Sequence, residues 1–462
     1  MEINVDKTKY TLFGTSDPHP LSLKLRGIPV GPEKTPELLG ITFPNYRGMS
    51  THVVQTRQRM NFRLLQLAAI SSTTWGSKRD VLRTFYLTLV QARTLYGFEI
   101  WYWDAAPTSR RVLDSGQNKA CRTIAGIPYG CRSADALREG CLLPLEMMAM
   151  IRSLKYLMRC QTRGGSLKES AEQVYHETHP VREFYVRIMK IYPTLVIEPR
   201  EPPLLTPTLR FGKRARFFTS LENVSADDPE ERKKEASERW IARHFRRKGT
   251  DPPPRTHYEI WTDGSVFLGV KSGAAAMIYK DGELLCTTHR GAGPLACSYT
   301  AESVALYEGL RRLLKIIPAN NPTPCRVSIF TDSLSLLTAL ETGPLTVKDP
   351  ILRLLWNLIL QVQRHKARIR LQFIFGHCGV VKNEKCDTEA KKDAELPQRT
   401  DTWITDIIAH AKRILKGEDK PHLSHTLKIT GSRDPTKDNP ELTREEETAL
   451  ARFSTGASHR YG

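Results

Sequence analysis

The sequence predicts an α/β protein with a mixed five-stranded sheet flanked by helices at residues 257–397, preceded by a mainly helical region. Three observations support this organisation. In residues 257–397, three strand-like runs are followed by alternating helices and strands, which is the pattern of a mixed sheet covered by helices. In residues 1–161, long stretches carry apolar residues at helical spacing. At 462 residues the chain exceeds one ordinary core, so we expect two or more folded units.

Residues 1–161 form the first expected domain. A strand-rich opening, in which Gly and Pro mark the turns, comes before long helical stretches. We place these helices at residues 49–68, 78–96, 109–124 and 144–160. The second helix carries an apolar stripe at helical spacing, which we interpret as helix packing. Its members are Leu82, Phe85, Tyr86, Leu89 and Val90.

The composition changes at residues 162–256, which we expect to be a basic, Pro-containing linker. Prolines between residues 199 and 207 interrupt any regular element. The basic stretch RKKEASERWIARHFRRK follows at residues 232–248, and a stiff DPPPR spacer ends the segment. Trp240 and Phe245 stand among its arginines, and two interpretations stay open for this stretch: a solvated helix face or a nucleic-acid contact.

The elements of residues 257–397 follow from local patterns. YEIWTDGS, GAAAMIYK and ELLCTTHR predict three successive strands joined by short Gly-containing turns. CRVSIFTD and RLQFIFGH predict two more strands. Helices are expected around them at residues 299–317, 333–341, 350–365 and 383–396. Residues 398–462 are expected to form a helical and flexible C-terminal tail, with helices at 402–415 and 442–453.

The charge of the chain predicts the class of its partner. A net charge of +19 favours a polyanion, meaning nucleic acid or an anionic membrane surface. No apolar run reaches the length of a membrane span, and the polar N-terminus does not resemble a signal peptide. The nine cysteines lack C-x-x-C pairs, which favours free thiols in a reducing compartment. We therefore expect nucleic acid as the partner, no membrane, and an intracellular protein of the nucleus or cytoplasm that is not secreted.

Four acidic residues stand where a soluble fold would place apolar or neutral ones. Asp263 and Asp332 end strand-like runs, each on the same strand face as the aromatic residue two positions earlier. Glu302 lies one turn before Leu306 on the apolar stripe of its helix, so its carboxylate points toward the sheet. Asp387 follows a His-Gly loop. Carboxylates gathered out of water repel one another, and divalent cations between them remove this repulsion. The four acids therefore predict a metal site at the carboxyl ends of the strands.

These motifs resemble, in this order, the type 1 ribonuclease H domain: WTDGS, TAES, FTDSLSLL and FGHCGVVKNEKCDTEA. The resemblance implies a ribonuclease H-like fold and a catalytic histidine, His377, which assists proton transfer or product release. It also implies that Asn383 and Glu384 shape the start of the last helix. The residues that match the catalytic, metal-binding acids of the family are Asp263, Glu302, Asp332 and Asp387.

The reaction that the resemblance implies is endonucleolytic hydrolysis of the RNA strand of RNA–DNA hybrids. Two Mg²⁺ ions about 4 Å apart would lie between the acids, with Asp263 best placed to touch both. Mn²⁺ is an expected substitute. One ion would activate a water and the other would stabilise the leaving 3′ oxygen. Discrimination against DNA requires contact with 2′-hydroxyl groups.

The first half resembles the thumb and connection region that follows the palm in LINE-type (non-LTR) retrotransposon polyproteins. ELLGITF, LYGFEIW and GCLLPLEMM carry this likeness, and the C-terminal LTREEETALARFSTGASHRYG resembles the segment after ribonuclease H in the same elements. The Y/F-x-D-D turn of a polymerase palm is absent, since the only Asp-Asp pair, at residues 227 and 228, lies in a polar loop. We expect a reverse transcriptase fragment or decayed copy that kept the nuclease.

A function from another class stays open: a catalytically inactive remnant that binds nucleic acid through its basic surface. The presence of all four acids and His377 favours activity, because drift would readily remove one of them. A working reverse transcriptase is excluded because the palm carboxylates are missing. A zinc-organised DNA-binding protein is excluded because no finger pattern is present, either in Cys121, Cys131 and Cys141 or in His377, Cys378 and Cys386.

Overall fold

The computed structural model of the chain describes residues 3–5, 7–14, 21–44, 48–191, 215–221, 224–245, 256–267, 270–318, 325–344, 346–347, 349–400, 402–418 and 434–457. The chain divides into two compact units, Met1–Tyr156 with Lys412–Gly462, and Leu157–Ala411. The boundaries fall inside two helices, α7 (Leu145–Arg163) and α16 (Ile404–Glu418). Among the described helices, none combines the length and the apolar character needed to cross a membrane.

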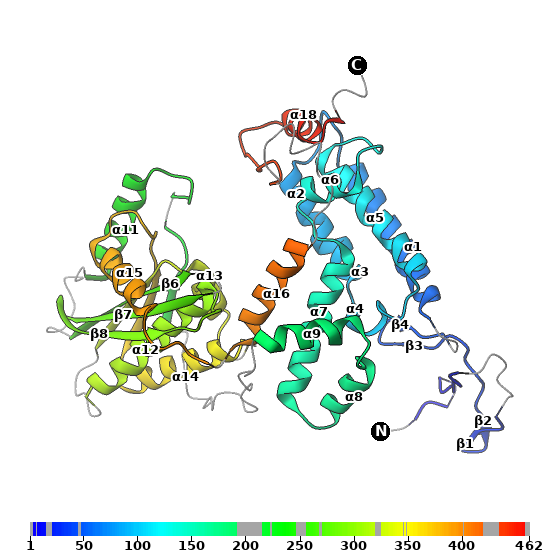
Figure 1. The fold of residues 1–462 in the computed structure, drawn as a ribbon, viewed down its shortest axis with the longest axis horizontal. Coiled ribbons are helices and arrows are strands. Elements are labelled where there is room, and N and C mark those ends of the chain that lie inside the picture. Colours follow the sequence, from blue (N-terminus) through cyan, green and yellow to red (C-terminus); the bar gives the residue numbers. More distant parts are fainter. Residues whose placement is uncertain are drawn as a thin grey trace. The chain divides into compact units, whose positions relative to one another are not determined.

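The first unit is mainly helical, as predicted (Figure 1). Two short hairpins open it: β1 (Lys24–Leu25) with β2 (Ile28–Pro29), and β3 (Glu37–Leu38) with β4 (Ile41–Thr42). The longest helices, α1 and α5, pack against each other. Pro107 begins α5, where its fixed φ suits the first turn, and Gly126 ends it with a φ of +67°. The helices are α1 (Ser50–Ala69), α2 (Arg79–Phe85), α3 (Ala92–Thr94), α4 (Phe98–Trp101), α5 (Pro107–Ala125), α6 (Ser133–Glu139) and α18 (Arg444–Ser454).

The helix predicted at residues 78–96 is interrupted. Between α2 and α3 the chain forms a π-helix, η1 (Tyr86–Gln91). A π turn holds more residues than an α turn and therefore rotates the side chains that follow it. The predicted packing stripe holds for Leu82, Tyr86 and Val90, which are buried, but it is wrong for Leu89, which is 43% exposed.

The C-terminal helix α18 belongs to the core of the first unit. Its Ala451 packs into a buried cluster with residues of α1, α2 and α5. The Arg444 guanidinium donates to the carbonyls of Ile124 (2.7 Å) and Thr123 (2.9 Å). The Glu447 carboxylate accepts from the N–H at position 79 (3.0 Å). Because a buried charge needs such partners, these contacts fix α18 against helices more than 300 residues earlier in the chain.

The second unit contains a six-stranded mixed sheet in the order β5-β10-β9-β6-β7-β8. The pairs β5–β10, β10–β9 and β9–β6 are parallel, while β6–β7 and β7–β8 are antiparallel. The five predicted strands are all present in this mixed sheet. The strands are β5 (Ala215–Phe218), β6 (His257–Phe267), β7 (Lys271–Lys280), β8 (Glu283–Gly291), β9 (Arg326–Thr331) and β10 (Arg368–Phe373).

Helices cover both faces of the sheet, which confirms the predicted α/β class. In Figure 1, α12 and α14 lie on one face and α15 on the other. Ile260 and Ile329 point into the core under α12 and α14, whereas Trp261 and Phe330 point into the core under α15. This alternation is the one that the strand patterns predict. The helices are α12 (Ser298–Ile316), α13 (Leu334–Glu341), α14 (Pro350–Arg364) and α15 (Val381–Asp393).

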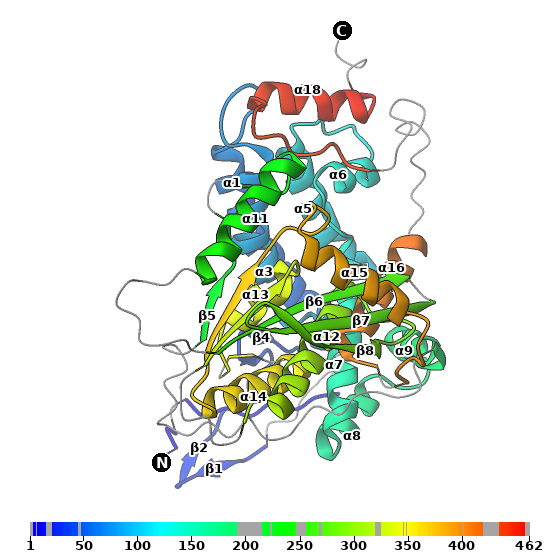
Figure 2. The same ribbon diagram turned by 90° about the vertical axis from the view of Figure 1, so that its left-hand side faces the viewer.

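Regular structure also occurs at residues 162–256, which the sequence pattern assigns to a linker. This stretch contains α8 (Ser166–Val174), α9 (Pro180–Ile191), β5 and α11 (Glu230–Phe245). Figure 2 shows β5 at the edge of the sheet, next to α11. β5 adds a sixth strand to the five predicted ones, because its backbone pairs with the otherwise open edge of β10. The domain boundaries given above stay predictions.

Candidate active site

Two parallel neighbours of the sheet, β6 and β9, carry the two strand acids. Trp261 of β6 pairs with Phe330 of β9, and their rings stack with centroids 4.4 Å apart. Asp263 lies two residues after Trp261, and Asp332 lies two residues after Phe330. Both acids therefore stand just beyond this last parallel pair, on the same face of the sheet. Asp263 differs from its prediction in one respect: β6 does not end there but continues to residue 267 as a hairpin with β7.

Glu302 reaches this edge from α12. It is buried, and its carboxylate accepts hydrogen bonds from the N–H of Gly264 (2.9 Å) and the hydroxyl of Thr331 (3.3 Å). Glu302 therefore ties the start of α12 to β6 and β9 rather than capping its own helix. Gly264 makes this contact possible, because a Cβ there would lie only 2.5 Å from the amide nitrogen of residue 302.

Asp387 comes from α15, and His377 comes from the loop that follows β10. Asp387 is buried on α15, and its Oδ2 pairs with Lys391 Nζ at 2.5 Å. His377 is exposed on the loop between β10 and α15, with a φ of +52°. Glu384, one turn before Asp387, accepts from the N–H of Gly379 (3.2 Å) and so fastens this loop to the start of α15.

All five predicted residues meet at one cavity of about 460 Å³. Ligand atoms of Asp263, Glu302 and Asp332 lie within 4.8 Å of one another. Ligand atoms of His377, Glu384 and Asp387 form a second group, in which the atoms also lie within 4.8 Å of one another. Both groups contribute to the lining of this cavity through the four acids and His377. Asn383 is buried near the start of α15 and does not line the cavity.

The electrostatics of the cavity favour binding of a cation. Burial, followed by the charges of Asp332 and Asp387, raises the pKa of Asp263 to about 8. Burial and the charges of Asp332 and Asp263 raise the pKa of Glu302 well above its usual value. Burial also raises the pKa of Asp332, although Glu302 and His377 act in the opposite direction. Without a cation, Asp263 would hold a proton at neutral pH.

The donor set fits a hard divalent cation. The groups that converge are carboxylate oxygens with one imidazole nearby, which Mg²⁺ and Mn²⁺ accept. Asp263 Oδ2 is buried and has no hydrogen-bond partner among the described residues. A buried carboxylate oxygen without a partner is costly, and a bound cation would supply the missing partner.

The cysteines do not form a second metal site in the described part of the chain. All nine are free thiols. Cys386 donates to the carbonyl of Trp261 (3.3 Å), and Cys378 donates to that of Phe375 (3.1 Å), so both act as buried packing groups. Cys141, in contrast, is exposed.

Supporting residues that sequence patterns do not reveal come from α11. Ser237 of this helix is fully buried, and its hydroxyl accepts from the N–H of Phe375 (3.4 Å), two residues before His377. The Lys234 side chain lies against the backbone of Gly379 in the same loop. Trp240 is half-buried against the core, with Arg243 over its ring at 4.4 Å. The helix therefore supports the loop that carries the histidine.

A second supporting residue, Gly376, lies directly beside Asp332. A Cβ at this position would collide with Asp332 Oδ2. The Asp332 carboxylate can therefore take this position only because residue 376 has no side chain. No sequence pattern predicts this contact, because it joins the carboxyl ends of β10 and β9, two neighbouring strands that are distant in the sequence.

Part of this chain is similar to known proteins. Residues 255–395 match the family described as RNase H. The chain is 30% identical over 169 residues to Ribonuclease H of Thermus thermophilus. This match covers 32% of this chain and 91% of that protein. It is 28% identical over 141 residues to the putative 115 kDa protein in type-1 retrotransposable element R1DM of Drosophila melanogaster. That match covers 29% of this chain, and the chain spans only 13% of that protein. LC11-RNase H1 solved in complex with an RNA/DNA hybrid is similar at 20% identity, with a TM-score of 0.25 over 30% of this chain and 96% of that one.

Proposed function

Because this chain belongs to the ribonuclease H family, we propose that it cleaves the RNA strand of RNA–DNA hybrids endonucleolytically, with two Mg²⁺ ions bound by its four acids. Residues 255–395 are its ribonuclease H domain. The family generally uses divalent metal ions, and one similar protein has been solved with an RNA/DNA hybrid bound. The proposal concerns which ions act, how many, and which residues hold them.

One observation carries this proposal. Four carboxylates that are far apart in the sequence line a single cavity, together with one exposed histidine. A structural role for these acids would require positively charged or hydrogen-bonding partners for each of them. Asp387 has such a partner in Lys391, but one oxygen of Asp263 has none among the described residues. An arrangement of this kind is expected of a site that binds cations.

The residues of the chain prepare the site in distinct ways. Bound divalent cations would neutralise the carboxylates and supply a Lewis acid and an activated water for attack on phosphorus. We assign the ligand role to Asp263, Glu302, Asp332 and Asp387. The N–H of Gly264 and the hydroxyl of Thr331 hold the Glu302 carboxylate in one orientation. Lys391 holds Asp387 in the absence of a cation, and its exposed side chain is free to release it.

His377 has a different role in this proposal. Its ring is exposed at the rim of the cavity, within reach of Asp387 and Glu384. An imidazole can both accept and donate a proton, so it suits proton transfer to the leaving 3′ oxygen or release of the product. The supported loop between β10 and α15 keeps the ring near the scissile phosphate while leaving it accessible to substrate.

We further propose that Mn²⁺ can substitute for Mg²⁺ in this site and that the chain derives from a retrotransposon. The similarity to the R1DM protein supports this origin, although it covers a small part of that protein. The compartment, nucleus or cytoplasm, stays a prediction. The alternative function, an inactive remnant that binds nucleic acid, would need the same basic surface but not the convergence of the acids.

The test is hydrolysis of a labelled RNA–DNA hybrid by the full chain. We expect internal cuts in the RNA that require Mg²⁺ or Mn²⁺ and stop when a chelator is added. Asp332→Asn should abolish the cuts, while Glu283→Gln, which changes an exposed acid of β8, should leave them intact. Intact RNA in the wild-type reaction, with hybrid binding retained, would establish the inactive remnant instead.

A further inference from the structure

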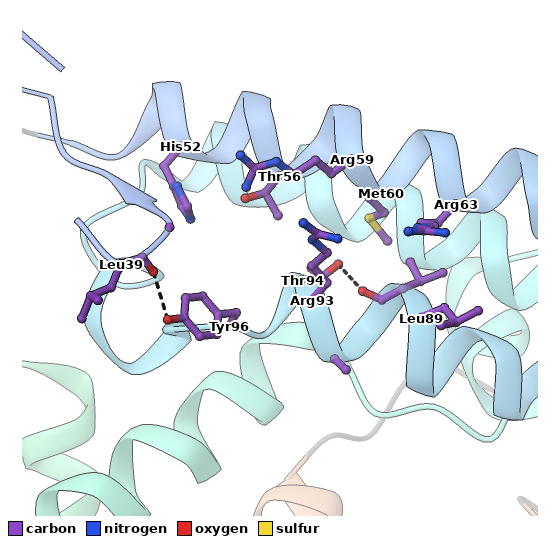
Figure 3. A pocket seen from close by; sticks show the side chains of 13 residues that line it. Leu39, His52, Thr56, Arg59, Met60, Arg63, Leu89, Arg93, Thr94 and Tyr96 are labelled. Atoms are coloured by element: carbon purple, nitrogen blue, oxygen red, sulfur yellow. Dashed lines mark hydrogen bonds between the residues drawn. The ribbon is translucent and has the colours of Figure 1, made fainter. Parts of the chain in front are cut away.

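A second cavity, of about 350 Å³, lies in the first unit between α1 and the η1–α3 segment (Figure 3). Its walls come from α1 on one side and from η1, α3 and Tyr96 on the other. It shares no lining residue with the cavity of the four acids. A volume of this size accommodates one small organic group such as a nucleotide.

The charge of this cavity is entirely positive. Arg59 and Arg63 of α1 and Arg93 of α3 line it, and no lining residue is acidic. Figure 3 shows Arg93 pointing from α3 toward the helix that carries the other two. Among the described residues, no carboxylate forms an ion pair with Arg59 or Arg93, so their charge is available to a ligand. A concave site with charges of one sign concentrates the opposite charge.

The remaining lining groups are uncharged. Burial, followed by the charge of Arg59, lowers the pKa of His52, and His52 Nδ1 accepts from the N–H of Thr42 (3.2 Å). This ring is therefore neutral at pH 7 and contributes no charge. Arg63 is held in place by Gln66, whose side-chain oxygen accepts its hydrogen bond at 2.9 Å.

An aromatic ring, that of Tyr96, lines the part of the cavity beside Leu39. Tyr96 is 53% exposed, yet its hydroxyl donates to the carbonyl of Leu39 (2.9 Å), which fixes the ring (Figure 3). Apolar atoms of Met60, Leu89 and Val90 complete the lining. The π-helix η1 supplies the last two, and π turns inside helices often mark functional sites.

We propose that this cavity binds an unpaired nucleotide of single-stranded nucleic acid. Guanidinium groups match the geometry of a phosphate, and a fixed aromatic ring provides a surface on which a base stacks. A base inside a duplex has both faces covered, so only an unpaired one could enter the cavity. An acidic peptide would meet the charges but would leave the exposed face of Tyr96 uncovered. The site is separate from the ribonuclease H cavity and requires no cleavage, so either proposal can fail alone.

The experiment measures binding of a fluorescent single-stranded DNA oligonucleotide to the full chain by anisotropy, with a chelator present to prevent metal binding at the four acids. We expect Arg93→Ala and Tyr96→Leu each to weaken binding roughly tenfold, as loss of a base-stacking or phosphate contact does. Tyr96→Phe keeps the ring and should bind nearly as the wild type does. Arg111→Ala removes an exposed charge of α5 outside the cavity and serves as the matched control. Circular dichroism spectra establish that each variant is folded.

Four outcomes decide the proposal. A loss confined to Arg93→Ala and Tyr96→Leu supports it, as does weaker binding of an oligonucleotide with abasic sites in place of bases. Equal affinities for Arg93→Ala, Tyr96→Leu and Arg111→Ala would overturn it. Equally tight binding of a polyglutamate peptide, lost in the same variants, would also overturn it and would identify a general site for acidic chains.

Discussion

Substitution of Gly264 by alanine tests how the site is built. The added Cβ would lie 2.5 Å from the amide nitrogen of Glu302 and 2.6 Å from the carbonyl carbon of Ala301. Both atoms belong to the backbone of α12, so the start of the helix has to move by roughly 1 Å to restore normal contacts. Overpacking of this kind costs about 1–3 kcal/mol. Weakening of the hydrogen bond from the N–H of Gly264 to the buried carboxylate adds to this, and we expect a total loss of about 2–4 kcal/mol.

The same displacement should reduce cleavage far more than it reduces the folded population. Misplacement of a catalytic group by about 1 Å costs on the order of 100-fold in rate. Hybrid cleavage by Gly264→Ala is therefore measured under single-turnover conditions well below its melting temperature. Gly309→Ala is the matched control. Gly309 lies on α12, the helix that carries Glu302, and its Cβ would crowd Ala276 of β7 and Ile260 of β6, away from the acids. If folded Gly264→Ala cleaved as fast as Gly309→Ala, the proposed link between this glycine and Glu302 would be wrong.

Three further outcomes are expected. Burial raises the pKa of Asp263 to about 8 and also raises those of Glu302 and Asp332, so the folded, metal-free chain keeps protons that the unfolded chain loses above about pH 4. Its stability in chelator should therefore fall as the pH rises from about 4 to 8, as chemical denaturation at several pH values would reveal; a flat or rising profile would contradict the raised pKa values. Ser237→Ala removes the hydroxyl that accepts from the partly buried N–H of Phe375. We expect a severalfold lower kcat with little change in KM, which Ser237→Thr should partly restore. Hybrid affinity should fall steeply between about 50 and 200 mM salt, because phosphate neutralisation releases counterions; salt-independent binding would argue against a charge-based interface.

The central part of the fold and the candidate site could be predicted because their signals are local. Alternation along β6 and β9 places Asp263 and Asp332 on one side of the sheet, and helical spacing points Glu302 inward. Each of these inferences needs only a few neighbouring residues and the period of one element. The class of the fold, a mixed sheet covered by helices, then follows from the succession of strands and helices.

Other features depend on contacts between distant segments and left no local signal. β5 joins β10 through backbone hydrogen bonds, to which its own side chains give little guidance. The π-helix η1 could not be predicted, because the apolar stripe indicates a continuous α-helix. A glycine is needed at position 376 because the carboxylate of Asp332, which follows the neighbouring strand β9, lies directly beside it. Composition also suggested a linker at residues 162–256, since prolines and charges outnumber the short apolar runs there.

The most direct test of the central claim is a crystal structure of the chain with Mn²⁺ and an RNA–DNA hybrid whose RNA strand carries 2′-deoxy nucleotides at the cut site. Anomalous scattering locates the manganese ions independently of any assumption about ligands. We expect two peaks inside the cavity, each within coordination distance of oxygens from Asp263, Glu302, Asp332 or Asp387. An empty cavity, with manganese bound elsewhere or only to the nucleic acid, would contradict the two-ion mechanism and the assignment of these four residues as its ligands.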